Sequence, residues 1–459
     1  MTANTTNAGT HHLGRWPWVV VVALVVVVIG AIVFASVHRV DATKSIPPVA
    51  RHADAPRKAT PFRLSALSPL PRATGVAYDA PIVLTFSDPL SPRTPLPSLI
   101  PAINGVWSVH HSELRFRPSG FYIPSSREQI LIPAGIRALD GTRLTVPIRS
   151  AFRVEAGSIL RLQQLLAELD YLPVGFAPKG PGPASIRATS ALTTEPVDPT
   201  VISLFPRPGQ FTWRFARIPS QLAETWQSGS WNVATEGAVI AFETDHHLAP
   251  DGEPGTEVWT QLLGAVAART PSIRPYDYLV VTETLPETLY VWRDGAVVFQ
   301  TPVNTGVYGA ATPLGTWPVY LRYTSTTMTG KNPNGTKYSD PGVPWVSYFH
   351  GSDAVHGFWR SNFGYPQSDG CVEVPVTNAA AIFPDDPYGT LVTVTTGNLG
   401  PELGTSAPAV AATRVVASTT TTVAPSTTTT SSTPSSPPST TSSPIPATTT
   451  ASASTTATT

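Results

Sequence analysis

Cysteine is almost missing from this chain, because Cys371 is the only one among its 459 residues. No intramolecular disulfide can form, so covalent cross-links do not stabilise the fold. Net charge is missing too, since 30 basic residues balance 30 acidic ones and leave no strong field that would attract nucleic acid. Charged residues make up only 13% of the chain, and it has 49 prolines. This composition is typical of a β-rich, loop-rich extracellular protein with low-complexity segments.

One long run has no charged residue. Residues 16–37 read WPWVVVVALVVVVIGAIVFASV, and as a helix rising about 1.5 Å per residue they would cross a hydrocarbon core of about 30 Å. We expect a cytoplasmic tail over 1–15 and a single transmembrane anchor over 16–38. Small residues before Ser36 leave a cleaved signal peptide open as the alternative. Basic residues on both sides of the run leave the orientation of the anchor open.

The next part of the chain predicts a linker followed by a β-sandwich. Residues 39–62 are polar and rich in proline, and residues 63–156 alternate apolar and polar positions in short runs between Pro, Gly and Ser clusters. Three of these runs are LTFSDPL (84–90), GVW (105–107) and LRFRP (114–118). Their order resembles that of bacterial immunoglobulin-like domains, which implies a sandwich of two sheets over 63–156.

Helical periodicity then replaces the alternation. Apolar residues in 158–172 recur at intervals of three and four, and they are Ile159, Leu162, Leu165, Leu166 and Leu169. Two further helices are predicted in 235–263, on either side of an Asp251-Gly252 turn. Together these helices resemble the two halves of a three-helix peptidoglycan-binding domain over 157–270. An insertion rich in Pro and Gly, 176–226, separates the halves, so a packing role without a ligand remains the alternative.

The last folded segment, 273–398, predicts a mostly β domain. Apolar and polar residues alternate again from residue 277, and Arg293-Asp294-Gly295 is typical of a hairpin turn. Residues 377–383 predict a short helix with Thr377 as its N-cap. Residues 399–459 consist mainly of Thr, Ser, Pro and Ala, and we expect them to be disordered. The composition of this tail is compatible with an O-glycosylated stalk and with a flexible spacer that carries no sugar.

The residues around the single cysteine point to acyl transfer. Such chemistry requires a thiolate, a base that accepts its proton, and donors for the oxyanion. His356 precedes Cys371 with fourteen residues between them, so a strand and its return could bring the two side chains together. Gly370 would allow the backbone to turn tightly before the cysteine. The pair alone leaves a buried, unreactive cysteine as the alternative.

The motif around this pair resembles the L,D-transpeptidase (YkuD-type) catalytic domain, whose signature is HG followed by (S/T)-x-G-C. His356-Gly357 and Ser368-Asp369-Gly370-Cys371 fall on that signature, and the segments 301–319 and 344–357 are also similar to the family. The resemblance implies that Cys371 is the nucleophile and His356 its base. It also implies that the carbonyl of Gly357 orients the imidazole, and that the amides of Gly370 and Cys371 form the oxyanion hole.

The resemblance assigns substrate-binding roles as well. It implies that Ser368 holds the loop and that an aromatic set lines the acyl-donor groove, although the same set could form core: Trp345, Tyr348 and Phe349. Asp369 stands where many members have His, and Glu373 stands where Arg or Asn is usual. These two residues are where substrate selection by this chain would differ from that of the family.

The implied reaction is cross-linking of peptidoglycan between third-position diamino acids, with release of D-alanine. Donor and acceptor stem peptides would be the partners, carbapenems would acylate the thiol, and no cofactor or metal would be needed. A zinc site built from His350, Asp353 and His356 is a weak alternative, and adjacent His246 and His247 on one helix cannot both face one ion. A wall-binding scaffold with a degenerate site, a carboxypeptidase and a protein-anchoring enzyme remain open. The substrate places the catalytic domain outside the cell membrane.

Overall fold

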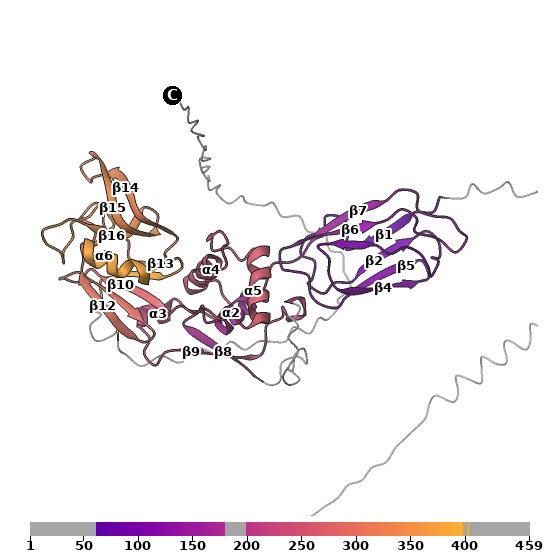
Figure 1. Ribbon diagram of the computed structural model, residues 1–459, viewed down its shortest axis with the longest axis horizontal. Helices are drawn as coiled ribbons and strands as arrows, with labels where there is room; N and C mark the ends of the chain where they lie inside the picture. The colour runs from indigo at the N-terminus through magenta and orange to yellow at the C-terminus, as the bar shows by residue number, and fades with distance from the viewer. Residues whose placement is uncertain (1–60, 180–198, 398–402, 404–459) are drawn as a thin grey trace, which may run out of the picture. The chain divides into compact units, whose positions relative to one another are not determined.

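The computed structural model describes residues 61–179, 199–397 and Leu403. These residues form a mostly β, multidomain protein with several sheets and a few short helices (Figure 1). Among them, no helix is long and apolar enough to cross a membrane. The predicted anchor over 16–38 and nearly all of the predicted tail over 399–459 lie outside the described residues.

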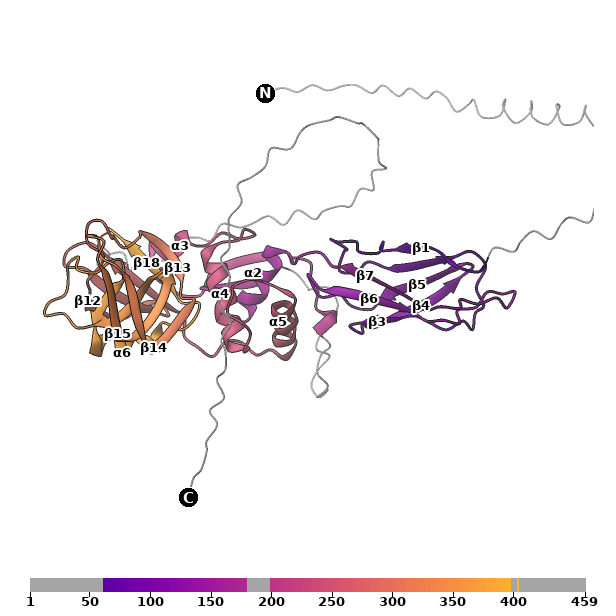
Figure 2. The same ribbon diagram turned by 90° about the horizontal axis from the view of Figure 1, so that it is seen from above.

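The segment from 64 to 153 contains seven antiparallel strands in two sheets (Figure 2). The four-stranded sheet has the order β1-β2-β5-β4, and the three-stranded sheet has the order β3-β6-β7. Their bounds are β1 Leu64–Ser68, β2 Ile82–Phe86, β3 Ser98–Ile100, β4 Gly105–His110, β5 Glu113–Pro118, β6 Arg127–Ile132 and β7 Ile148–Arg153. Alternate residues of β2 are buried, namely Ile82, Leu84 and Phe86, and they join Ile130 and Ile132 of β6 in one core.

The middle segment contains a two-stranded sheet and four α-helices, of which α2, α4 and α5 pack together. The elements are α2 Ile159–Glu168, β8 Val174–Pro178, η1 Pro199–Val201, β9 Gly209–Trp213, α3 Ser220–Glu224, α4 Val233–Asp245 and α5 Thr256–Ala268. The side chain of Ser158 caps α2, and that of Asn232 caps α4. The predicted insertion over 176–226 contains regular structure, because most of β8, all of β9, which pairs with it, and α3 lie within it.

One expectation about this segment is wrong. His246 and His247 are not both on a helix, because α4 ends before them. His246 is the C-cap residue, and His247 has a left-handed backbone with φ of 58°.

The segment from 277 to 395 contains two more sheets. One has the order β12-β11-β10-β18-β13 and the other the order β14-β15-β16-β17. The strands are β10 Asp277–Thr282, β11 Thr288–Arg293, β12 Ala296–Pro302, β13 Gly315–Pro318, β14 Leu321–Lys331, β15 Lys337–His350, β16 Asp353–Phe358, β17 Val372–Pro375 and β18 Leu391–Thr395. The two sheets and the helix α6, Val376–Ile382, share one apolar core.

Two local features of this segment follow from single residues. Asp294 and Gly295 have φ of 47° and 102° and join β11 to β12 in the predicted tight turn. The N-cap of the helix α6 is Pro375, two residues earlier than the predicted Thr377, which lies inside the helix. The proline ends β17 and has its φ already fixed, so the chain turns directly from strand to helix.

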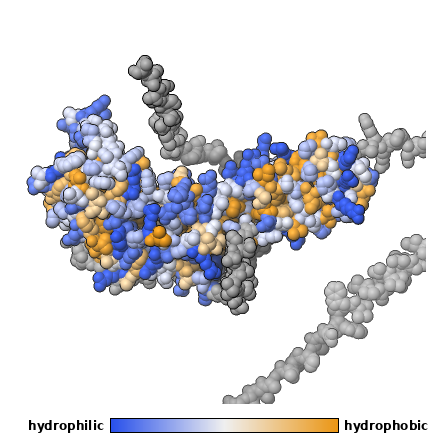
Figure 3. Space-filling model, viewed as in Figure 1, coloured by the Kyte–Doolittle hydropathy of each residue, from blue (hydrophilic) through white to orange (hydrophobic). Residues whose placement is uncertain are grey.

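The long β14–β15 hairpin differs from the other strands of its sheet. Its outer half is mostly exposed, and its surface is hydrophilic or of intermediate hydropathy in Figure 3. Its inner half pairs with β16, with Ser347 opposite Val355. The hairpin therefore projects from the sheet that carries the histidine and the cysteine.

Candidate active site

Two neighbouring strands carry the predicted catalytic pair. His356 lies in β16, and Cys371 directly precedes β17, which runs parallel to β16 with His356 opposite Glu373. Side chains alternate along a strand, so residues two apart share a face. Cys371 thus belongs to the same face as Glu373 and His356. The strand and return that the sequence predicted are present.

A cavity of about 290 Å³ opens on this face. His356 and Cys371 both line it. The rest of the lining comes from the β14–β15 hairpin and from the chain on either side of the pair, and consists of Met328, Asn332, Tyr338, Asp340, Phe358, Arg360, Ser368, Asp369 and Glu373. The projecting hairpin therefore forms one wall of the cavity that contains the thiol and the imidazole.

The imidazole of His356 is buried, with 3% of the residue exposed. Its Nδ1 lies 3.1 Å from the carbonyl oxygen of Gly357, as the resemblance implied. Because a carbonyl only accepts, this bond assigns the proton to Nδ1 and leaves Nε2 as the basic nitrogen. Burial lowers the pKa of His356, so the ring is neutral and can accept a proton at neutral pH.

The surroundings of the Cys371 thiol favour its protonated form. Burial of the sulfur raises the pKa of Cys371 to about 12, and the carboxylates of Asp353, Glu373 and Asp369 also raise it. The backbone of Ala354 acts in the opposite direction through a hydrogen bond. The Sγ atom lies 3.7 Å from the carbonyl oxygen of Ser352 and donates to it. Attack by this sulfur consequently requires a base to remove its proton.

Ser368 holds the loop that precedes the cysteine. Its hydroxyl donates to the carbonyl of Cys371 at 2.5 Å and accepts the N–H of Gly370 at 3.2 Å. The predicted oxyanion role of the Gly370 amide therefore requires its bond to Ser368 to open. Gly370 has φ of 117°, and a Cβ there would lie 2.7 Å from Oδ1 of Asp353, so only glycine fits.

Buried polar residues that the sequence did not reveal support this loop. The carboxylate of Glu287 accepts hydrogen bonds from the backbone N–H and from the hydroxyl of Thr305, both at 2.7 Å. The carbonyl of Thr305 in turn accepts the N–H groups of Gln367 and Ser368, both at 2.9 Å. No local motif marks Glu287, because its partner lies in another loop.

Comparison with protein families matches residues 277–394 to YkuD, the L,D-transpeptidase catalytic domain. This segment is a YkuD-type catalytic domain. The family is one of cysteine-dependent transpeptidases, and the match covers the whole cavity. A search of curated protein sequences finds no match.

Solved structures of L,D-transpeptidases resemble the chain. An L,D-transpeptidase from Mycobacterium smegmatis is 12% identical over 73% of this chain and 99% of its own, with a TM-score of 0.24. L,D-transpeptidase 3 from Mycobacterium tuberculosis, in complex with a faropenem-derived adduct, is 12% identical over 72% and 97%, with a TM-score of 0.24. The catalytic domain of an L,D-transpeptidase from E. faecium is 24% identical over 27% and 99%, with a TM-score of 0.24.

An ion pair that the sequence did not predict lies in the cavity of the YkuD-type domain. Arg360 donates from Nε and Nη2 to the two carboxylate oxygens of Glu373, at 2.8 and 2.6 Å. The carboxylate is buried, and the guanidinium also lies over the ring of Phe358. Glu373 raises the pKa of His356 and Arg360 lowers it, although burial is the larger influence. The pair places a cation in the same cavity as the thiol and the imidazole through a residue outside the motif.

The predicted substrate-binding residues separate into two groups. Ser368 and Asp369 line the cavity of the YkuD-type domain. Three aromatic residues lie outside the lining that the structure describes. Phe349 is a core residue, Trp345 packs against Phe383, and Tyr348 packs edge-on against Tyr323.

The three residues considered for zinc, His350, Asp353 and His356, do not form one ligand cluster. His350 Nδ1 lies 3.1 Å from Oδ2 of Asp353, and its ring packs on Trp317, while His356 bonds the Gly357 carbonyl. Among the described residues, no cluster of three metal-ligating side chains is found.

Proposed function

We propose that this protein is a cell-wall L,D-transpeptidase that links peptidoglycan stem peptides through a thioester on Cys371. One observation carries the proposal. A neutral His356, whose Nδ1 is held by the Gly357 carbonyl, lines the same cavity as the only thiol, within a domain of a cysteine-dependent transpeptidase family.

The first step forms the acyl-enzyme. Nε2 of His356 accepts the proton of the Cys371 thiol as the sulfur attacks the carbonyl that joins the third-position diamino acid to the terminal D-alanine. The C–N bond breaks, the imidazolium returns the proton to the departing amine, and D-alanine leaves. The high pKa of the thiol requires proton transfer to accompany attack, because a free thiolate is scarce at neutral pH.

The second step transfers the acyl group. A side-chain amine on the third residue of a neighbouring stem attacks the thioester and loses its proton to His356. The amide forms as the C–S bond breaks, and the imidazolium returns the proton to the sulfur, which restores the thiol and the neutral base. The product is a cross-link between two third-position residues. Water as the acceptor would make the same chemistry a carboxypeptidase, and an amine of a protein would make it an anchoring reaction.

We place the catalytic domain on the outer side of the cell membrane. The uncharged run at 16–37 would supply a single-pass anchor, and the proposed substrate, the assembled wall, lies outside the cytoplasm. Protease added to intact spheroplasts should remove the catalytic domain of a C-terminally tagged chain and leave a cytoplasmic marker protein uncut. A catalytic domain that is cleaved only after lysis would contradict this placement.

Muropeptide profiling tests the activity. A strain that expresses the wild-type chain should gain dimers linked between third-position residues, and one that expresses Cys371→Ala at equal level should not. New tetrapeptide-to-tripeptide conversion without such dimers would favour the carboxypeptidase. Attachment of a labelled protein to the wall that depends on Cys371 would favour the anchoring enzyme.

A wall-binding protein without catalysis is the second candidate, and one observation favours it. In the structure the Cys371 thiol donates to the Ser352 carbonyl, and its pKa is raised to about 12, which is the state of an unreactive thiol. This candidate predicts that the protein sediments with purified sacculi while the wild type and Cys371→Ala give identical muropeptides.

A further inference from the structure

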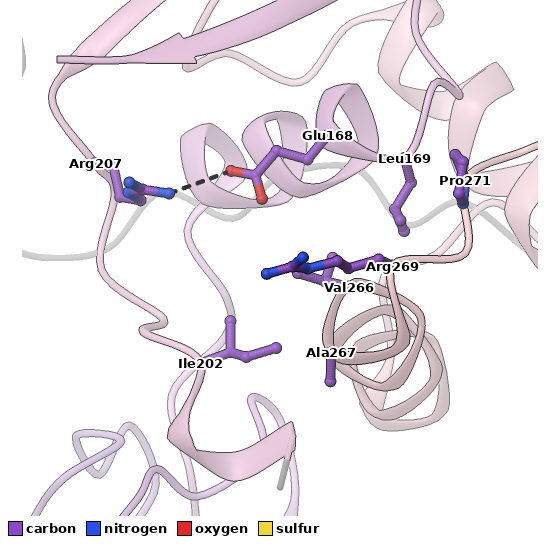
Figure 4. Close-up of a pocket in the computed structure, with 8 residues that line it drawn as sticks. All are labelled: Glu168, Leu169, Ile202, Arg207, Val266, Ala267, Arg269 and Pro271. Atoms are coloured by element: carbon purple, nitrogen blue, oxygen red, sulfur yellow. Dashed lines mark ion pairs between the residues drawn. The ribbon is translucent and has the colours of Figure 1, made fainter. Parts of the chain in front are cut away.

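A second cavity lies in the helical segment, in a part of the chain separate from the thiol. Its volume is about 520 Å³, and it is formed by the end of α2, the chain from 202 to 207, the end of α5 and Pro271. Figure 4 shows its charged and apolar sides. The charged lining consists of Glu168, Arg207 and Arg269, and the apolar lining consists of Leu169, Ile202, Val266, Ala267 and Pro271.

Buried polar side chains of α2 hold the loop segment that carries Arg207. The side-chain amide of Gln164 donates to the carbonyl of Arg207 at 2.8 Å, and its oxygen accepts the N–H of Arg207 at 2.9 Å. Nε of Arg161 donates to the carbonyl of Ser203 at 2.9 Å. Gln164 and Arg161 are almost fully buried. The cavity wall is thus built before any ligand arrives.

Positive charge exceeds negative charge at this cavity. Glu168 is the one carboxylate of its lining, and it is shared by Arg161 at 3.5 Å and Arg207 at 3.8 Å. Both distances are longer than that of a strong charge-assisted hydrogen bond. Arg269 adds a third guanidinium, and no hydrogen bond or ion pair of its side chain is found within the described ranges. A cavity with this surplus favours an anion.

Arg269 points into the cavity although its backbone would suit glycine better. It follows α5 with a left-handed φ of 56°, a conformation that costs an L-residue free energy. The backbone N–H groups of Arg269 and Thr270 already cap the last carbonyls of the helix, at Val266 and Ala265. The side chain is therefore not required for capping. Figure 4 shows it extending between Ile202 and Glu168.

We propose that this cavity binds a carboxylate on a molecule with a small apolar body, such as the C-terminus of a short peptide or a free acylated amino acid. Arg269 and Arg207 would bind the carboxylate, since a guanidinium offers two donors in the geometry that a carboxylate accepts. The apolar side, with Ile202 and Val266, would cover the rest of the molecule. The site is independent of the proposed chemistry at Cys371.

Calorimetric titration of the purified full-length chain tests the site. The probes are N-acetyl-leucine and N-acetyl-D-alanyl-D-alanine, each compared with its neutral amide, and inorganic phosphate. At least one of the two acids should bind, and its amide should bind at least tenfold more weakly. Binding by only the D-alanyl probe would narrow the ligand to wall-type peptides, and binding by both would extend it to free acids.

Arg269→Gly separates binding from folding. The change removes the guanidinium and the left-handed strain together, so the melting temperature should stay equal or rise while carboxylate affinity falls at least tenfold. Arg72→Gly is the matched control, because Arg72 is also exposed with φ of 64° but lies in the β-sandwich. It should leave carboxylate binding unchanged.

Three results would overturn the proposal: equal binding of acids and amides, phosphate binding as tight as that of the acids, or unchanged affinity in Arg269→Gly. Acylation of Cys371 should proceed at the wild-type rate in Arg269→Gly. A failure of this proposal therefore leaves the proposed transpeptidase unaffected, and the reverse also holds.

Discussion

Arg360 and Glu373 form a two-bond ion pair inside the cavity that contains the thiol and the imidazole. Glu373 is the register partner of His356 across the two parallel strands, so its carboxylate lies on the same face as the imidazole. The carboxylate is buried while a third of the Arg360 side chain is exposed. Glu373 therefore influences the pKa of both the thiol and the imidazole, and Arg360 influences that of the imidazole.

Glu373→Gln should make the thiol more acidic. The carboxylate of Glu373 is one of the groups that raise the pKa of Cys371, and its removal leaves the cation of Arg360 nearby. The pH profile of Cys371 alkylation by iodoacetamide should shift toward lower pH. Glu113→Gln, which removes a partly exposed carboxylate paired with Arg115 in the β-sandwich, should leave the profile in place. An unchanged profile in Glu373→Gln would contradict the proposed influence.

Arg360→Met should destabilise the domain by roughly 1–3 kcal/mol, because it leaves the buried carboxylate of Glu373 without its partner. The double variant Arg360→Met with Glu373→Met should recover most of this loss, since neither charge remains. Urea unfolding of the three proteins measures both effects. Equal stability of the single and double variants would show that the pair is not coupled.

The pH dependence of acylation should have a single acidic limb. Burial lowers the pKa of His356 below its usual 6.5, so the neutral base persists into mildly acidic solution. The acylation rate should fall only below pH 6.5, as the imidazole becomes protonated. A midpoint above 6.5 would contradict a neutral, buried His356.

The free energy of unfolding should also depend on pH through His356, and this part of it should decrease as the pH falls. The unfolded chain binds a proton at His356 more readily than the folded chain does, because the folded pKa is the lower one. The contribution of His356 to stability is therefore present above pH 6.5 and is lost as the pH falls below it. His356→Gln should flatten this part of the stability profile, which thermal unfolding across pH can measure.

Gly370→Ala should disrupt the loop before the cysteine. A left-handed backbone costs an L-residue roughly 1–2 kcal/mol, and here the added Cβ also meets Oδ1 of Asp353. We expect a loss of more than about 2 kcal/mol and of most acylation. Gly141→Ala is the control, because Gly141 has φ of 88° with open space around it, so strain acts alone. Equal effects of the two changes would contradict the contact with Asp353.

Glu287→Ala should slow acylation from a distance. It removes the acceptor of two buried hydrogen bonds from Thr305, whose carbonyl holds the backbone of Gln367 and Ser368. The expected destabilisation is about 1–3 kcal/mol. Glu287→Gln keeps one acceptor and should retain more activity than Glu287→Ala. Full activity of the alanine variant would show that the loop does not depend on this support.

The sequence allowed the meeting of His356 and Cys371 in one cavity, and the loop before the cysteine, to be predicted, because these depend on local order. His356 and Gly357 are neighbours, and the bond between them needs only a strand. Ser368 bonds the backbone of a residue three positions away. Gly370 before the cysteine also indicated a special backbone, which its φ of 117° shows.

Other parts of the site depend on contacts that no local pattern encodes. Arg360 meets Glu373 only because β16 and β17 lie side by side in one register. Glu287 and Thr305 meet through loops of different strands. The polar run TSTTMTGK also shows little apolar alternation, so the length of β14 and its place beside the cavity were missed.

Intact-protein mass spectrometry after exposure to a carbapenem tests the central claim most directly. The wild-type chain should gain the mass of one ertapenem molecule, Cys371→Ala should gain none, and His356→Gln should react far more slowly. The protein unfolded in denaturant should also gain none, because the imidazole and the thiol then no longer share a cavity. A folded wild-type chain that remains unmodified would contradict an acylating thiol at Cys371.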